Sequence, residues 1–398
     1  MQKVVLKAGK DEFVRRFHPW IFSGAVARME GDKLSDGDVV EVTDHHGNTL
    51  GIGHFHHGSI AVRLVHFGKA DVMQTDFWKQ KFQQAWQVRQ VAGLADHPHT
   101  DCFRLSHGEG DGMPGLVVDI YGDVAVMQCH SIGMHRQREL LTEALRQTLG
   151  KRLRGVYDKS AEALPGNYSA KHSNGWLWSA EPDMTPQAIV HENGIRFKVD
   201  WQTGQKTGFF LDQRDNRQLL ATFAAGKSVL NAFCYTGGFS CYALKAGAER
   251  VVSIDASAKA MDLTGENVLL NAPFTGSNES LTEDVLRYFK QVEEQFDVVV
   301  VDPPAFAKSM EKRHNAVQGY KRLNEAAIKH VKPGGILFTF SCSQVVDREL
   351  FYHTIAAAAM EAGRPARVLH HLTQGADHPV SMFHPEGAYL KGLVLHLT

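Results

Sequence analysis

The sequence has almost no net charge and no long hydrophobic run. Its 43 lysines and arginines oppose 44 aspartates and glutamates in 398 residues, a formal charge of −1. This balance excludes a uniformly basic nucleic-acid coat and an acidic disordered tail. The longest purely apolar stretches, such as 355–360, are far shorter than the roughly 20 residues of a membrane helix, and we expect no signal peptide. With 43% hydrophobic residues, the chain can bury ordinary cores.

Paired cysteines are missing as well. The cysteines are odd in number, widely spaced and without a Cys-x-x-Cys pair; they are Cys102, Cys129, Cys234, Cys241 and Cys342. This spacing excludes a disulfide framework and a zinc knuckle, and it favours a reducing cytoplasm. No cysteine or carboxylate completes the histidine motif at 54–57, so we expect no metal site there or elsewhere.

What is present divides into three regions. At roughly 150 residues per domain, the length predicts two or three domains, and the patterns place them at 1–72, 73–189 and 190–398. The first region has short strands at 39–42 and 60–65 separated by turns. Several short strands in so few residues predict a small β-barrel-like module.

The second region mixes helical and strand patterns. We predict a helix over 77–91 that Thr75 caps, and another over 135–149 that Gly150 ends. Between them, the glycine-rich segment 104–115 leads into an apolar strand, which requires tight backbone turns. Together these patterns predict a central α+β domain.

The third region alternates apolar strands with helical stretches. The strands are expected at 228–233, 251–254, 296–301 and 335–340. This order predicts an α/β fold with a parallel sheet covered by helices on both faces. A last strand at 392–397 follows a polar stretch without a convincing helix. This strand can therefore join the sheet in the antiparallel direction.

Polar residues stand where several of these strands end. The first strand opens into a turn with Gly237 and Gly238, where a missing side chain lets a ligand approach the backbone. Asp255 ends the second strand, Asp284 follows a weaker third strand, and Asp302 follows the fourth. Open α/β sheets bind ligands at the carboxyl ends of their strands, and an acid at the second strand can accept ribose hydroxyls. We therefore predict a site for a nucleoside-containing cofactor.

Five motifs carry a resemblance to known proteins. Asp302-Pro-Pro-Ala looks like the motif after the fourth strand of Rossmann-like S-adenosylmethionine-dependent methyltransferases. The other four are His18–Gly24, Gly204–Arg217, Phe340–Ser343 and Ala376–Val380. Over almost its whole length the chain resembles the bacterial 23S ribosomal RNA cytosine-5 methyltransferases with an N-terminal PUA domain. The resemblance implies an RNA-binding PUA module at 1–72, a methyltransferase domain at 190–398, S-adenosylmethionine as cofactor and 23S rRNA as partner.

Carried over residue by residue, the resemblance also implies a cofactor site. A segment before the first strand would flank the cofactor, the first turn would form its floor, and later strand-end acids would hold its ribose and adenine. The residues are Phe210, Asp212, Gln213, Arg214, Asn231, Phe233, Tyr235, Thr236, Gly237, Asp255, Ser257, Asp284, Asp302 and Pro303. The residue patterns alone indicate only the glycine turn, Asp255, Asp284 and Asp302.

The implied reaction needs a nucleophilic cysteine. Carbon 5 of cytosine is a poor nucleophile until a thiolate has attacked carbon 6. Cys342 is the candidate, because it follows the strand at 335–340 in a small polar setting and its motif Phe-Ser-Cys-Ser matches the family. Many RNA cytosine-5 methyltransferases have a second cysteine after the Asp-Pro of the fourth strand, and this chain has none there. Asp302 is a candidate for the base that removes the carbon-5 proton, with an orienting role equally open to it.

RNA binding calls for basic side chains and exposed aromatic faces. The candidates are Arg15, Arg16, His18, Trp20 and Lys308, and Lys308 and Tyr320 are candidates to face the substrate. The plainer alternative for Trp20 is a buried anchor of the small barrel. Residues 1–70 carry nine basic and eight acidic side chains, so the module is not strongly basic.

Other functions remain open from the sequence. Motifs like Asp302-Pro-Pro-Ala also occur in methyltransferases that act on an amino or ring nitrogen, which attacks directly and needs no cysteine. A cofactor-binding RNA protein without chemistry and a small-molecule methyltransferase are further alternatives. Cys342 favours the cytosine-5 reaction, and two regions before the catalytic one disfavour a small-molecule substrate. The sequence leaves the oligomeric state open, a homodimer included.

Overall fold

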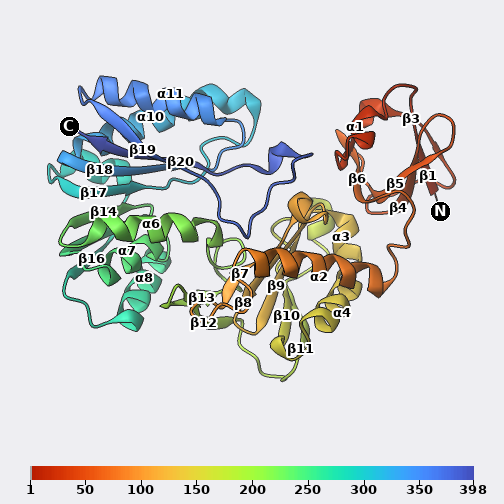
Figure 1. Cartoon of the computed structure of the whole chain (residues 1–398), viewed down its shortest axis with the longest axis horizontal. Helices are drawn as coiled ribbons and strands as arrows, with labels where there is room; N and C mark the ends of the chain where they lie inside the picture. The colour runs from red at the N-terminus through yellow and green to blue at the C-terminus, as the bar shows by residue number, and fades with distance from the viewer. Residues whose placement is uncertain (1) are drawn as a thin grey trace. The chain divides into compact units, whose positions relative to one another are not determined.

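The computed structural model describes residues 2–398 and divides the chain into two compact units (Figure 1). The first unit runs to Val190 and also contains Val199–Leu211 and Ala376–Gly387. The second unit consists of His191–Lys198, Asp212–Gly375 and Ala388–Thr398. The small barrel and the central region therefore share one unit. Among the described residues, no helix is long and apolar enough to cross a membrane.

A six-stranded sheet opens the first unit, with strand order β2-β6-β5-β4-β1-β3. Its strands are β1 (Gln2–Leu6), β2 (Trp20–Phe22), β3 (Val26–Glu30), β4 (Val39–Thr43), β5 (Thr49–Phe55) and β6 (Ile60–Phe67), with the short helix α1 (Glu12–Arg15) between β1 and β2. Val40 and Val42 alternate inward on β4 and are fully buried in a small core. The β-rich module and its two predicted strands are confirmed, as β4 and β6.

The rest of the first unit is a five-stranded sheet with helices, in the order β11-β10-β9-β8-β7. Its elements are α2 (Thr75–Val91), β7 (Cys102–His107), β8 (Leu116–Tyr121), β9 (Val124–Cys129), α3 (Ile132–Arg136), α4 (Arg138–Leu149), β10 (Gly155–Asp158), α5 (Gly166–Ser169) and β11 (Gly175–Ser179). This confirms the α+β prediction.

Two local predictions for this region need correction. Thr75 is the first residue of α2, and Gln74 occupies the cap position. The helix expected over 135–149 is two helices, because Gln137 has φ −99° and ψ 10° and interrupts the turn between α3 and α4. Gly150 ends α4 at φ 55°, as predicted.

The second unit is built on a seven-stranded sheet with order β16-β15-β14-β17-β18-β20-β19. The strands are β14 (Ser228–Ala232), β15 (Arg250–Asp255), β16 (Ser277–Thr282), β17 (Phe296–Val301), β18 (Val331–Ser341), β19 (Ala366–Leu372) and β20 (Lys391–Leu397). The first five are parallel, and β20 runs antiparallel to both β18 and β19. The α/β fold and the antiparallel last strand are thus observed.

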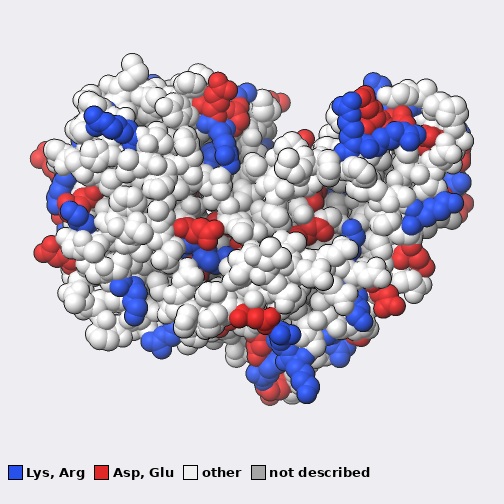
Figure 2. Space-filling model, in the orientation of Figure 1, with Lys and Arg blue, Asp and Glu red and all other residues white. Residues whose placement is uncertain are grey.

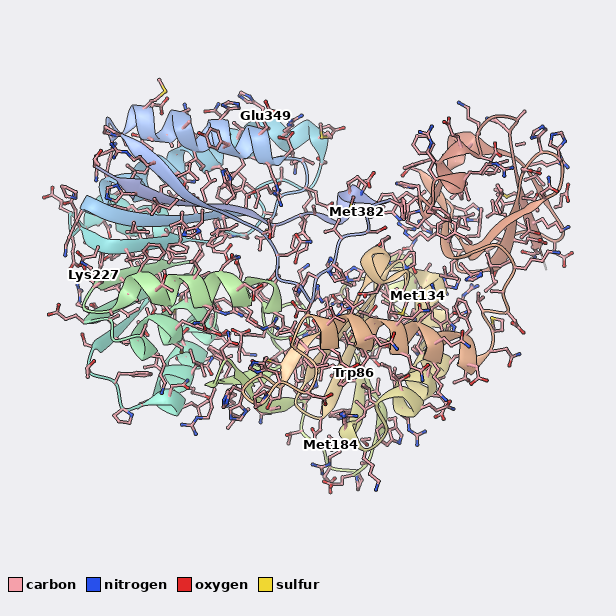
Figure 3. All side chains as sticks on the ribbon, in the orientation of Figure 1. Trp86, Met134, Met184, Lys227, Glu349 and Met382 are labelled. Carbon is pink, nitrogen blue, oxygen red and sulfur yellow. The ribbon has the colours of Figure 1, made fainter. Side chains whose placement is uncertain are left out.

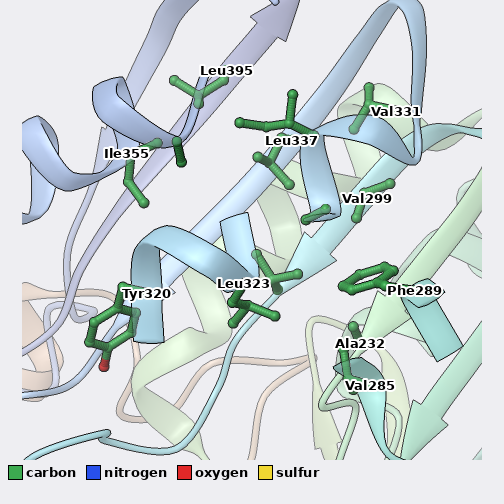
Figure 4. Close-up of a cluster of buried hydrophobic side chains, with 14 of the residues drawn as sticks. Ala232, Val285, Phe289, Val299, Tyr320, Leu323, Val331, Leu337, Ile355 and Leu395 are labelled. Atoms are coloured by element: carbon green, nitrogen blue, oxygen red, sulfur yellow. The ribbon is translucent and has the colours of Figure 1, made fainter. Parts of the chain in front are cut away.

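Buried valines on β17 explain why the sheet is covered on both sides. Val299 and Val301 belong to one apolar cluster, and Val298 and Val300 to another. The first cluster, part of which Figure 4 shows, packs against α9 (Val285–Gln291), α10 (Arg313–Lys329) and α11 (Arg348–Glu361). The second packs against α6 (Arg214–Ala224) and α7 (Gly238–Lys245), and α8 (Ala258–Asn271) follows β15.

One edge strand and one pair of strands had no clear signal in the sequence. β19 is the edge strand of the large sheet, and most of its side chains are exposed, so it lacks the apolar run of an interior strand. The chain passes between the two units through a two-stranded sheet of β12 (Gln187–Glu192) and β13 (Ile195–Asp200). Its alternating pattern is too short to stand out from a turn-rich stretch.

A group of buried ion pairs, which we name the paired network, lies in the first unit. Its members are Arg89, Arg104, Asp111, Asp119 and Asp377. Arg89 binds both carboxylate oxygens of Asp111, at 2.5 and 2.8 Å. Arg104 binds Asp119 in the same way, at 2.7 and 2.9 Å. These bidentate pairs are the strong geometry for a guanidinium and a carboxylate.

The fifth member comes from far along the chain. Asp377 lies on Ala376–Gly387, which we name the crossing segment. Its carbonyl accepts a hydrogen bond from Arg89 at 2.8 Å, and its carboxylate accepts one from the backbone N–H of Arg104 at 2.9 Å. Met382, labelled in Figure 3, lies on the same segment and is 90% exposed. The segment is therefore fixed at one end and solvent-facing further along.

Candidate active site

The turn after β14 holds two bulky residues in a left-handed backbone. Phe233 has φ 60°, Tyr235 φ 48° and Gly237 φ 76°. Such conformations cost of order 1–3 kcal/mol for a residue with a side chain, and they cluster at ligand sites. A Cβ on Gly237 would lie 2.7 Å from Cγ2 of Thr264, so packing against α8 requires glycine there as much as the backbone does. The strain falls where the sequence predicts the floor of a cofactor site.

Asp255 and Ser257 stand beside this turn, at the end of β15. The Asp255 carboxylate accepts the backbone N–H of Tyr235 at 3.0 Å and that of Ser257 at 2.9 Å. The Ser257 hydroxyl accepts the N–H of Ala260 and caps α8. Thr236 is buried in the turn. Each carboxylate oxygen has further acceptor capacity, so Asp255 is oriented by the backbone and can still take a ribose hydroxyl.

Asp284 follows β16 and caps α9. Its carboxylate accepts the N–H of Arg287 at 2.8 Å. This helix cap explains an acid at the position without any ligand, so contact with adenine stays a prediction. Pro303 is buried directly after Asp302, and its ring fixes the backbone where β17 ends.

Asp212 and Asn231 carry buried acceptor oxygens without a partner. Oδ2 of Asp212 accepts the hydroxyl of Tyr389 at 2.6 Å, while Oδ1 has no hydrogen-bond partner among the described residues. The Asn231 amide donates to Ser240 Oγ at 2.8 Å, and its Oδ1 is likewise unpartnered within the described chain. Buried acceptors without donors are costly and call for a ligand or water. Both oxygens therefore point to a group that supplies N–H or O–H donors.

Arg214 and Phe210 have surroundings that do not point to a ligand. Arg214 is buried, and its Nε lies 3.6 Å from Glu192, to which Arg217 makes a closer pair at 2.7 Å. This ion pair is enough to explain the charge of Arg214 in the interior. Phe210 is half-buried near the end of Val199–Leu211, in the first unit. Neither observation tests a cofactor role for these residues.

Asp302 directly follows β17 in a setting that disfavours its charge. Its Oδ2 accepts a hydrogen bond from the Gln213 amide at 2.8 Å. Burial and the neighbouring Asp212 carboxylate raise the pKa of Asp302 to about 7, and the Gln213 hydrogen bond opposes this only in part. A carboxyl group with a pKa near neutrality can exchange a proton at physiological pH. Asp302 therefore has the properties of a proton-transfer group.

Cys342 directly follows β18 and differs from the other cysteines. It is half-buried, whereas the remaining four are buried. Burial, followed by the charges of Asp302 and Asp212, raises the pKa of the Cys342 thiol to about 11. Asp302 and Cys342 therefore act on each other electrostatically at the ends of neighbouring strands. A thiol in this field needs help to ionise.

Lys391 holds the loop after Cys342, and no pattern in the sequence indicated this role. Its ammonium donates to the carbonyls of Ser343 and Val346, both at 2.7 Å. The Ser343 hydroxyl donates to the carbonyl of Ala307 at 2.7 Å, which ties this loop to the one after Asp302. Lys391 is the first residue of β20, and the Tyr389 that binds Asp212 directly precedes that strand. Only the antiparallel return of β20 brings both to the site.

The chain is similar to known proteins over most of its length. The family model of S-adenosylmethionine-dependent methyltransferases matches residues 104–381, and a PUA-like domain matches residues 4–67. Ribosomal RNA large subunit methyltransferase I of Aeromonas hydrophila is 40% identical over 397 residues, which cover 98% of both chains. The protein of the same name from Escherichia coli O139:H28 is 40% identical over 395 residues. The chain belongs to the S-adenosylmethionine-dependent methyltransferase family.

Solved structures agree on the fold. A protein from Streptococcus mutans, described as an S-adenosylmethionine-dependent methyltransferase, superposes with a TM-score of 0.84 over 100% of both chains, at 23% identity. A further methyltransferase structure, complexed with SAH, superposes equally well. The methyltransferase sheet and the PUA-like barrel predicted from the motifs are therefore confirmed.

The residues of the site fit S-adenosylmethionine, the cofactor of this family. Its amino acid part carries an ammonium group, for which the unpartnered oxygens of Asp212 and Asn231 are suitable acceptors. Asp255 at the second strand suits its ribose. When bound, the cofactor supplies a methyl group on a positively charged sulfur.

The PUA-like part of this methyltransferase presents less free charge than its sequence suggests. Arg15 is paired with Asp11 and Asp44, at 2.6 and 3.0 Å, and Arg16 is paired with Glu12. On the face drawn in Figure 2, basic and acidic side chains are interspersed. Lys308, in the second unit, is exposed. RNA contact by these cations stays a prediction.

His18 is buried and Trp20 is half-buried. The Trp20 indole N–H donates to Glu109 at 2.8 Å, and RNA contact by Trp20 stays a prediction. His18 lies with His384 and Glu386 in a group whose ligand-type atoms are within 4.8 Å of one another. Its Nδ1 accepts the backbone N–H of Trp20 at 3.2 Å, so the ring proton is on Nε2, which faces Glu386 at 3.6 Å. A protonated nitrogen has no lone pair for a metal. His384 Nε2 lies 3.7 Å from Glu386, and neither ring nitrogen of His384 has a hydrogen-bond partner among the described residues.

Two surface grooves of the second unit lie away from this chemistry. One, of about 390 Å³, is lined mainly by α11 and β19, and the other, of about 410 Å³, lies where β17 and β18 begin. Neither groove includes Asp302 or Cys342. The volumes of these grooves therefore do not locate the strand-end site of this methyltransferase.

Proposed function

We propose that this methyltransferase modifies carbon 5 of a specific cytosine in 23S rRNA through a covalent bond between Cys342 and carbon 6. The observation that carries the proposal is the position of Cys342. It is the half-buried cysteine among four buried ones, it follows the strand next to that of Asp302, and the charge of Asp302 acts on its thiol. A methyltransferase that used a nitrogen as nucleophile would have no need of a thiol there.

The chain's own groups divide the chemistry between them. Attack by the Cys342 sulfur on carbon 6 moves an electron pair toward carbon 5, which becomes the nucleophile for methylation. Asp302, as the carboxylate, then takes the hydrogen from carbon 5, and the sulfur–carbon bond breaks to restore the double bond. A pKa of about 7 for Asp302 makes it a base at the pH of a cytoplasm, where we place the protein.

The RNA substrate is inferred from the relatives and the PUA-like domain. The relatives named above are ribosomal RNA large subunit methyltransferases. PUA-like modules suit RNA binding, and exposed Lys308 together with Arg15 and Arg16 are the cations we propose for phosphate contact. Since net charge is near zero, base capture beside Cys342 must supply much of the selectivity.

The test is the substitution Cys342→Ala, assayed with labelled S-adenosylmethionine and 23S rRNA from a strain that lacks the enzyme. We expect no methyl transfer, because the nucleophile is lost. RNA containing 5-fluorocytosine should become covalently attached to the wild-type protein, and mass spectrometry should locate the bond at Cys342. The matched control is Cys102→Ala, a buried cysteine of the first unit, which should methylate normally.

The alternative reaction gives the opposite result. If Asp302-Pro-Pro-Ala oriented a nitrogen of a base for direct attack, Cys342→Ala would methylate at the normal rate and no adduct would form. Mapping the modified nucleotide would then identify a nitrogen-methylated base in place of 5-methylcytosine.

A further inference from the structure

Phenylalanine side chains gather on the surface of the first unit. Phe17 of the PUA-like region and Phe383 of the crossing segment are 51% and 53% exposed, and their ring centroids lie 5.3 Å apart. Phe13, Phe22 and Met382 are exposed as well. We name these five residues the aromatic surface. Exposed apolar residues that stand alone need no explanation, but a group of them marks a site of interaction.

A layer of buried and half-buried rings lies behind the aromatic surface. The His384 ring is 4.4 Å from that of Trp20 and 5.4 Å from that of His18, between centroids. The His18 ring lies 6.1 Å from Phe13 and 6.2 Å from Phe22. Since His384 belongs to the crossing segment and the other rings to the small barrel, this layer fixes the segment to the PUA-like region.

The backbone of Phe17 is strained. Its φ is 63°, a left-handed conformation that is costly for a bulky side chain and that clusters at ligand sites. Its N–H donates to the carbonyl of Val14 at 2.9 Å, which closes the turn after α1. The ring lies 5.4 Å from that of Phe67 on one strand and 5.3 Å from that of Phe383. The strained turn therefore holds a ring in place while half of it stays in solvent.

An exposed arginine stands beside these rings. Arg16 directly precedes Phe17, and its side chain is 74% exposed. It pairs with Glu12, which is exposed too, and exposed ion pairs contribute little, so a phosphate can take the place of this glutamate. Single-stranded RNA stacks its bases on aromatic faces while its phosphates bind cations. The match to a PUA-like domain covers residues 4–67 and thus most of the aromatic surface.

We propose that the aromatic surface binds unpaired bases of the RNA substrate, which stack on Phe17 and Phe383 while Arg16 contacts their phosphates. Residues 1–70 are nearly neutral, so stacking supplies affinity that phosphate attraction does not. Every base has a flat face, and stacking therefore adds affinity without choosing a sequence. The inference rests on the proposed function, in which RNA is the substrate, but it does not depend on the reaction at Cys342.

The substitution Phe383→Leu tests this because leucine stays apolar but offers no flat ring. Binding to the full chain is measured at fixed salt by fluorescence anisotropy, with a labelled oligoadenylate and with a blunt RNA duplex. We expect the affinity for the oligoadenylate to fall about tenfold, and that for the duplex, whose bases are already stacked on one another, to stay the same. Phe17→Leu should act in the same direction. Phe383→Trp keeps a flat ring and should bind the oligoadenylate at least as well as the wild type.

Tyr352→Leu is the matched control. Tyr352 is an exposed aromatic residue on α11, in the second unit and outside the aromatic surface. Its replacement should leave the affinity for the oligoadenylate unchanged. Because Phe383 is half exposed, Phe383→Leu should melt close to the wild type, and this measurement separates lost stacking from lost folding.

Several results would overturn the inference. They are a wild-type protein that does not bind the oligoadenylate, an unchanged affinity in Phe383→Leu, an equal loss in Tyr352→Leu or in Phe383→Trp, and an equal loss for the duplex. A wild-type dimer that Phe383→Leu separates, as light scattering would show, would assign the aromatic surface to a second copy of the chain instead.

The proposed reaction is decided separately. If binding is unchanged in Phe383→Leu while Cys342→Ala abolishes methylation, the aromatic surface is refuted and the proposed function stands. Conversely, weakened binding in Phe383→Leu together with full methylation by Cys342→Ala would support the aromatic surface and refute the cytosine-5 reaction.

Discussion

The paired network of the first unit and the strand-end site of the second handle buried polarity in opposite ways. In the network, the guanidinium groups of Arg89 and Arg104 and the carboxylate of Asp377 all make hydrogen bonds. In the site, Asp212 and Asn231 each keep a buried oxygen without a partner among the described residues. Satisfied networks rigidify a fold, while unsatisfied groups raise its free energy and persist where function needs them. The comparison therefore assigns a structural role to the network and leaves the two oxygens available to a ligand.

The first prediction concerns the network and has the largest expected effect. Arg89→Met removes a guanidinium that is fully buried and leaves Asp111 as an uncompensated buried charge. We expect the first unit to lose about 3–5 kcal/mol in its free energy of unfolding, measured by urea denaturation of the full chain. Cys342 alkylation in the folded protein should not change.

The control for Arg89 is an exposed ion pair in the same unit. Arg154 pairs with Asp123 at 3.2 Å, and its side chain is 46% exposed. Arg154→Met should cost less than about 1 kcal/mol. If both substitutions lower the free energy of unfolding by the same small amount, the network does not stabilise the first unit and this half of the comparison is wrong.

The second prediction concerns Asp302, whose replacement should stabilise the fold, whereas that of Arg89 should destabilise it. Asp302→Asn keeps the shape of the side chain but removes the proposed base, so methylation should fall at least about 100-fold. In the wild type, the methylation rate should rise between pH 6 and 8 as Asp302 loses its proton near pH 7. The variant should rise only with ionisation of the Cys342 thiol, whose pKa is about 11, and should show no change of slope near pH 7. A variant that retains both rate and pH profile would assign the base elsewhere.

The stability of the same variant checks the sign of the pKa shift. Between pH 4 and 7 the folded protein keeps a proton on Asp302 that the unfolded chain has released, because the folded pKa is raised from 3.8 to about 7. Asp302 therefore contributes stability that decreases as pH rises through this window. Asp302→Asn should melt above the wild type at pH 8 and close to it near pH 4, as differential scanning calorimetry would show.

The third prediction is the smallest and concerns the cofactor. Asp212→Asn can still accept the Tyr389 hydroxyl, but it loses the charge offered to a ligand ammonium. We expect the affinity for S-adenosylhomocysteine to fall about tenfold, or about 1.4 kcal/mol, in a calorimetric titration. Asp262→Asn, on the exposed side of α8, is the control and should bind normally. Equal affinities in the two variants would remove Asp212 from the site.

Periodic burial explains which parts of the fold the sequence could predict. β17 reads as an unbroken apolar run because its valines alternate between two buried clusters, and the parallel sheet follows from such runs. β19 was missed because an exposed edge strand has no such signal. The break at Gln137 was missed because it depends on one backbone conformation, which composition does not reveal.

Much of the candidate site was also beyond sequence reasoning. Strand-end acids such as Asp255 and Asp302 follow from topology, because the carboxyl ends of parallel strands share an edge. The contacts of Tyr389 and Lys391 span more than 40 residues along the chain, and no local pattern encodes them. Likewise, no local pattern indicates the ion pairs of Arg15 with Asp11 and Asp44 or the hydrogen bond of Trp20 to Glu109.

The crossing segment has a consequence for how the protein is made. Synthesis delivers the N-terminal part of a chain first, and domains usually fold as they emerge. Here Asp377, which binds Arg89 and Arg104, is synthesised 288 and 273 residues after them. The first unit is therefore completed only after Asp212–Gly375 of the second unit has been made, and a chain that stops before residue 376 lacks part of both units.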